Sequence, residues 1–175
     1  MERLFILYGE QSAGKTSTLC KVFELLSGHK LTKKEPQPDF RIVFQVGKKW
    51  VYIATYGDSV GVIQTNFEFF NQKPHGNTII YEYNDKSFIT IDNQRLKEIN
   101  PNICISACRI YKNGTPNTIY DEVNKQIMNF LPVTRGIQWI AKIKGKGTRK
   151  ENKVINTDSD TALQIVSEII KECIF

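Results

Sequence analysis

The sequence predicts an α/β fold: a three-layer α/β/α sandwich with a mostly parallel sheet and one antiparallel hairpin. Apolar, β-prone runs alternate with segments whose apolar residues recur at helical spacing. The length of 175 residues suits one domain, expected over 1–175, that can bury a proper core. The composition, with 41% hydrophobic and 24% charged residues, is ordinary for a globular protein.

The chain begins with an apolar run from Arg3 to Tyr8, which predicts a buried strand. After a short glycine-bounded loop, a helix is expected from about Lys15 to Ser27, with Gly28 as its stop. Its buried face carries four apolar residues at helical spacing: Leu19, Val22, Phe23 and Leu26. The first elements are therefore a strand, a loop and a helix.

The loop, Gly9-Glu-Gln-Ser-Ala-Gly14-Lys15-Thr16, fits the pattern G-x-x-x-x-G-K-[ST]. Its glycines allow a tight turn and a close approach of backbone N–H groups to phosphate. Lys15 is expected to contact the β- and γ-phosphates, and the Thr16 hydroxyl to bind Mg²⁺. The predicted nucleotide-binding residues are Gly9, Gln11, Ser12, Ala13, Gly14, Lys15, Thr16 and Ser17.

In this context of strand, loop and helix, residues 3–27 resemble the P-loop NTPase superfamily. The resemblance covers a small part of the chain. It implies a P-loop fold with a nucleoside triphosphate at the carboxyl ends of the strands. It identifies a nucleotide site and leaves the reaction open.

Two strand-like runs at 40–46 and 50–55 are joined by a short Gly47-Lys-Lys link, which predicts an antiparallel hairpin. The second run is nearly all apolar or β-branched, so a central strand is expected there. The runs 78–83 and 87–91 predict either a hairpin inserted at the sheet edge over 77–92 or one core strand. The remaining expected elements are helices at 60–70, 92–99, 118–130 and after 157, and strands at 102–108 and 136–143.

A Mg²⁺ site beside the loop also needs an acidic residue at a strand end. Asp58 is preferred as this metal ligand and catalytic residue, because it follows the expected central strand, which itself follows the first helix. Asp92 is the alternative, because it directly follows the run 88–91. A turn at Asp58 and a helix cap at Asp92 are the structural alternatives.

Arg109 ends the buried run 102–108, on the side where the nucleotide is expected. An arginine there can stabilise phosphate charge or clamp an anionic acceptor, so Arg109 joins Lys15 and Asp58 as a candidate catalytic residue. A surface arginine in a loop explains the same position equally well.

The GTPase pattern does not extend beyond the loop. A regulatory GTPase carries D-x-x-G after its hairpin, but the corresponding stretch here is Ala54-Thr-Tyr-Gly57. No N-K-x-D element is present, because Asn124-Lys125 is followed by Gln126-Ile127. ATP is therefore predicted as the nucleotide rather than GTP.

Charge and composition bear on partners and compartment. The net charge of +6 and the basic stretch 142–153 suit an anionic acceptor or nucleic acid, although a solvated loop explains the stretch as well. The four cysteines form no C-x-x-C pair and are expected to be reduced thiols. No apolar stretch approaches the length of a membrane span, and the N-terminal apolar run leads straight into the glycine-bounded loop rather than forming a signal peptide. No membrane contact and a cytoplasmic protein are therefore expected, and no oligomeric state is indicated.

The leading prediction is an ATP-binding, Mg²⁺-dependent protein that hydrolyses the nucleotide or transfers its γ-phosphoryl group. One alternative is a nucleotide or small-metabolite kinase. Another is a nucleotide-dependent module that binds nucleic acid or protein with little turnover. The loop is common to all three, so the sequence does not decide between them.

Overall fold

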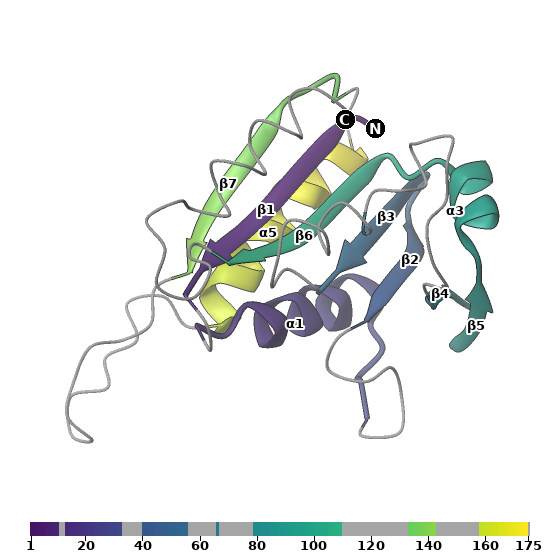
Figure 1. The fold of residues 1–175 in the computed structure, drawn as a ribbon, viewed down its shortest axis with the longest axis horizontal. Helices are drawn as coiled ribbons and strands as arrows, with labels where there is room; N and C mark the ends of the chain where they lie inside the picture. The colour runs from purple at the N-terminus through teal and green to yellow at the C-terminus, as the bar shows by residue number, and fades with distance from the viewer. Residues whose placement is uncertain are drawn as a thin grey trace.

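The computed structural model describes residues 1–10, 13–32, 40–55, 66, 79–109, 133–142 and 158–174. The strands in these ranges are β1 (Arg3–Gly9), β2 (Arg41–Val46), β3 (Lys49–Ala54), β4 (Ile80–Asn84), β5 (Ser87–Ile91), β6 (Ile103–Arg109) and β7 (Ile137–Lys142). The helices are α1 (Lys15–Ser27), α3 (Asn93–Ile99) and α5 (Asp158–Ile174). Figure 1 shows their arrangement.

The strands form one sheet in the order β5-β4-β2-β3-β6-β1-β7. Strands β3, β6, β1 and β7 are parallel, and β2 pairs antiparallel with β3. At the outer end, β4 is parallel to β2 and antiparallel to β5. The predicted α/β class, the mostly parallel sheet and the antiparallel hairpin are confirmed. Because β6 lies between β1 and β3, the carboxyl ends of these three strands meet at one edge.

One face of the sheet is covered by α1 and α5, which pack side by side (Figure 1). From β1, the side chains of Phe5 and Leu7 point into this layer and are fully buried. From α1 it receives Leu19, Val22 and Phe23, as the helical spacing predicts. The continuous apolar character of β1 therefore reflects burial on both faces, as is usual for central parallel strands.

The opposite face carries a second apolar cluster, which includes Leu4 and Ile6 of β1 and Leu96 of α3. Asn66, a helical residue, is fully buried over this face, where its backbone carbonyl accepts a hydrogen bond from Tyr52 Oη at 3.0 Å. The rest of the helices expected at 60–70 and 118–130 lies outside the described residues. The third layer of the sandwich therefore stays a prediction.

Candidate functional site

The loop 9–16 leaves the sheet at the carboxyl end of β1. Gly9 is the last residue of that strand, and a Cβ added to it would collide with the backbone carbonyl of Lys142 on β7. Gly14 precedes α1 with φ 86°, a left-handed conformation that residues with a Cβ rarely adopt. Both glycines of the motif are therefore required by the backbone. Gln11 and Ser12 lie outside the described residues.

Lys15 folds back over the loop from the first turn of α1. Its ammonium group donates hydrogen bonds to the carbonyl of Gly9 at 3.1 Å and to that of Glu10 at 2.7 Å. The side chain is only 8% exposed. A cation is thus held beside the first two residues of the loop, where it could meet an anionic group that approaches them.

The N-terminal end of α1 adds positive potential at the same place. The first turn of the helix contains no acidic residue, and its N-cap, Gly14, has no side chain to occupy the backbone N–H groups. Thr18, one turn into the helix, is fully buried, and its Oγ1 has no hydrogen-bond partner among the described residues. Thr16 is half-buried and Ser17 is exposed. These features fit an anionic ligand.

Two further cations flank Gly9. In the strand register, Arg109 of β6 lies opposite Gly9 on one side and Lys142 of β7 on the other. Two residues earlier in these strands, Leu7, Ala107 and Ile140 belong to the core beneath α1 and α5. Because side chains alternate along a strand, Arg109 and Lys142 leave the sheet on the face that α1 covers. Arg109 thus ends beside the loop, where the sequence places it.

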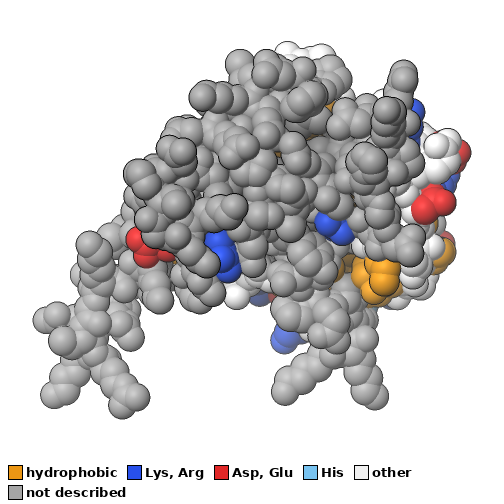
Figure 2. Space-filling view, viewed as in Figure 1, with side chains coloured by type: hydrophobic (Ala, Val, Ile, Leu, Met, Phe, Trp, Pro, Cys, Tyr) orange, Lys and Arg blue, Asp and Glu red, His pale blue; other side chains and the backbone are white. Residues whose placement is uncertain are grey.

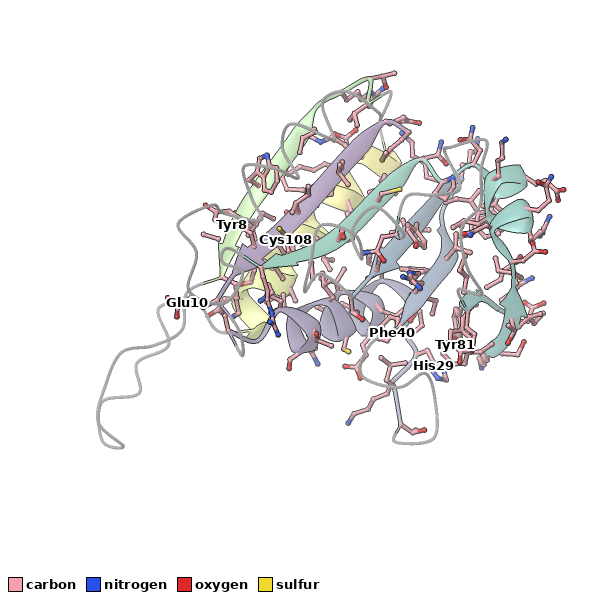
Figure 3. The ribbon with its side chains drawn as sticks, viewed as in Figure 1. Tyr8, Glu10, His29, Phe40, Tyr81 and Cys108 are labelled. Atoms are coloured by element: carbon pink, nitrogen blue, oxygen red, sulfur yellow. The ribbon has the colours of Figure 1, made fainter. Side chains whose placement is uncertain are left out.

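Cys108 precedes Arg109 in β6 and belongs to the apolar cluster on the opposite face, and Figure 3 shows it with Tyr8 and Glu10 at the ends of β1 and β6. Burial raises the pKa of the Cys108 thiol to about 12, although the charge of Lys15 opposes this shift. Its Sγ donates to the carbonyl of Arg109 at 3.1 Å. Cys108 is therefore a protonated structural thiol at neutral pH. The other cysteines are free thiols as well.

The two candidate acidic metal ligands, Asp58 and Asp92, follow different strands of the sheet. Asp58 lies outside the described residues, although the strand that precedes it, β3, is central and buried as expected. Asp92 follows the edge strand β5, five strands and about 24 Å from β1. Its Oδ1 accepts a hydrogen bond from the backbone N–H of Arg95 at 2.8 Å and caps α3. Asp92 is therefore a helix cap, and the alternative metal role is wrong.

The burial of Lys142 is what the sequence analysis missed, although the strand expected at 136–143 includes this residue. The basic stretch 142–153 suggests an exposed loop, but Lys142 is the last residue of β7 and only 2% exposed. Residues 143–153 lie outside the described part of the chain. The few Lys and Arg side chains visible in Figure 2 lie apart from one another. A lysine that ends an apolar strand run was the available signal.

A buried polar network on the other face was also missed. Arg41 Nε donates to Asn66 Oδ1 at 2.8 Å, and Asn66 Nδ2 contacts Ser106 Oγ at 3.3 Å. All three residues are buried. The network ties the start of β2 and the middle of β6 to the residue that lies over them. It fixes the position of Asn66, eight residues after Asp58 in the chain.

No family of known proteins, no curated protein and no solved structure gives a match to this chain. None of the described helices is both long and apolar enough to cross a membrane. Within the described ranges, no three His, Cys, Asp or Glu side chains gather into a group that could hold a metal ion.

Proposed function

We propose that this chain binds ATP with Mg²⁺ at the loop 9–16 and cleaves or transfers the γ-phosphoryl group, in a three-layer fold of the P-loop NTPase kind. The observation that carries the proposal is the geometry of Lys15, whose ammonium is held over the loop by the carbonyls of Gly9 and Glu10. The N-terminal end of α1, with no acidic residue in its first turn and no side-chain cap, and the buried Thr18 hydroxyl without a described partner support it.

The residues have distinct roles in this proposal. Lys15 and the loop amides neutralise charge that develops on the phosphates. Thr16 would hold Mg²⁺ directly and Asp58 through water; when bound, the ion supplies Lewis-acid stabilisation of the phosphate oxygens. Arg109, in register with Gly9, clamps the terminal phosphate or an anionic acceptor.

The direct test measures ATP binding by calorimetry with and without Mg²⁺. Lys15→Met should weaken binding by about 100-fold, because a charge-assisted contact to phosphate is lost from a buried site. Lys21→Met, on the same helix but 42% exposed, is the matched control and should bind as the wild type does. Equal affinity of Lys15→Met and wild type would refute the site.

The two other functions differ from simple hydrolysis in their products and partners. A kinase would form ADP only in the presence of its acceptor, so ADP production with and without candidate acceptors separates the two reactions. A nucleotide-dependent binding module would show little turnover and, if its partner is nucleic acid, binding that falls steeply with salt.

A further inference from the structure

Lys142 combines a charge with almost complete burial at the edge of the sheet that holds the loop. A lysine at a strand end normally extends its ammonium into water, because burying a charge is costly. Here the side chain is 2% exposed and leaves the sheet on the face covered by α1 and α5. Its position therefore differs from that of a residue in a solvated basic loop.

Lys142 is also unusually close to the loop. A Cβ added to Gly9 would lie 3.3 Å from the Cβ of Lys142, on the side where the Lys142 side chain begins. The carbonyl of the same glycine accepts the hydrogen bond from Lys15 Nζ. Gly9 is thus bordered by two lysines, one from β7 and one from α1, and only a glycine permits the strands to approach so closely.

We propose that Lys142 is a second phosphate-binding lysine of this site and that it contacts the α- and β-phosphates; the inference rests on the proposed function. Arg109 and Lys142 flank β1 on opposite sides. If Arg109 contacts the γ-phosphate, the chain of phosphates runs across Gly9 toward β7, and the end nearest the nucleoside lies beside Lys142.

This assignment separates the roles of the two flanking cations. The α- and β-phosphates are present in both ATP and ADP, so loss of the Lys142 charge should weaken the binding of both nucleotides by the same factor. The γ-phosphate is present only in ATP, so loss of the Arg109 charge should weaken the binding of ATP alone. The ratio of the ATP and ADP dissociation constants thus distinguishes the two residues.

The experiment measures ATP, ADP and AMP affinities by calorimetry for wild type, Lys142→Met and Arg109→Met, after circular dichroism confirms that each variant is folded. Lys142→Met should weaken ATP and ADP about tenfold each, as expected for one charge-assisted contact. Lys49→Met is the matched control: it removes a partly buried lysine that pairs with Glu2 at the opposite edge of the sheet. Lys142→Arg, which keeps the charge, should retain most of the affinity.

If Lys142→Met binds ATP and ADP with the same affinity as Lys49→Met does, the inference is overturned and the proposed function is left intact. Weakened ATP binding with unchanged ADP binding would overturn the assignment to the α- and β-phosphates. Wild-type protein that binds none of the three nucleotides would overturn the proposed function, and this inference with it.

A measurement on the wild type covers the case in which Lys142→Met does not fold. The ¹³Cε resonance of Lys142, assigned with Lys142→Arg, should shift on saturation with ADP, and the resonance of Lys49 should stay in place. An unshifted Lys142 resonance in ADP-saturated protein would refute the contact.

Discussion

The two ends of α1 are built in opposite ways. At its N-terminal end the helix meets a glycine, a buried lysine and the flanking cations of two strands. At its C-terminal end it meets aromatic rings, and Figure 3 shows His29 and Tyr81 there, across the view from Glu10. One end concentrates positive charge, and the other buries apolar surface. The helix thus joins a region suited to ligand binding to one that contributes stability.

Phe23 is the centre of the C-terminal end. Its ring lies 5.1 Å from that of Phe44 and 5.2 Å from that of Tyr83, both in edge-to-face geometry. His29 follows the helix and lies 5.2 Å from the Tyr83 ring. The Gly28 N–H donates to the Glu24 carbonyl at 3.0 Å and ends the helix. These contacts connect α1 to β2 and to the β4–β5 hairpin.

The largest effect should come from removing the centre of the aromatic end. Phe23 is fully buried, so Phe23→Ala should lower the free energy of unfolding by about 3–5 kcal/mol, measured by urea denaturation. Leu25→Ala, 40% exposed on the same helix, is the control and should cost far less. If the two ends are independent, folded Phe23→Ala should bind ATP as tightly as wild type; a large loss of affinity would show that they are coupled.

An intermediate effect is expected at the start of the loop 9–16. In Gly9→Ala the new methyl group meets the Lys142 carbonyl, so β1 and β7 must separate, at a cost of about 1–3 kcal/mol in stability. ATP affinity should fall as well, because the loop starts at this residue. Thermal unfolding and calorimetry measure the two changes.

Gly28→Ala tests the same kind of substitution at the other end of α1. Gly28 has φ 68° and nothing within 4 Å of an added Cβ, so only backbone strain of about 1–2 kcal/mol is expected. Its ATP affinity should equal that of the wild type. Equal losses of affinity in the two glycine variants would contradict the distinction between the ends.

The same comparison shows which features a sequence can reveal. The strand, loop and helix at residues 3–27 were predictable because their signals are local: an apolar run, a fixed spacing of glycines and a helical repeat. The order of the strands was not, because β6 pairs with β1 through residues about 100 positions apart and with β3 through residues about 50 positions apart. The burial of Lys142 depends on the pairing of β7 with β1, which is equally non-local, and was missed for the same reason.

The two candidate acids show how tertiary position decides between local signals. Asp58 and Asp92 each follow a β-prone run, and each has a turn or cap alternative in the sequence. The sheet order puts β5 at the outer edge, so Asp92 lies far from the loop. Its side chain caps α3 instead. The aromatic end is equally non-local, because Phe23 meets Tyr83 across 60 residues of chain.

The smallest effect should come from Thr18→Val, which keeps the shape of the side chain and removes its hydroxyl. Thr18 Oγ1 is buried and has no hydrogen-bond partner among the described residues, so the nucleotide-free protein should gain up to about 1 kcal/mol in the free energy of unfolding. If the hydroxyl serves the ligand, ATP affinity should fall in the same variant, and stability and binding would change in opposite directions. Ser17→Ala, at an exposed position of the same turn, is the control for stability. A less stable Thr18→Val protein would show that the hydroxyl already has a structural role without nucleotide. The N-terminal end of α1 would then contribute stability without a ligand, as the aromatic end does.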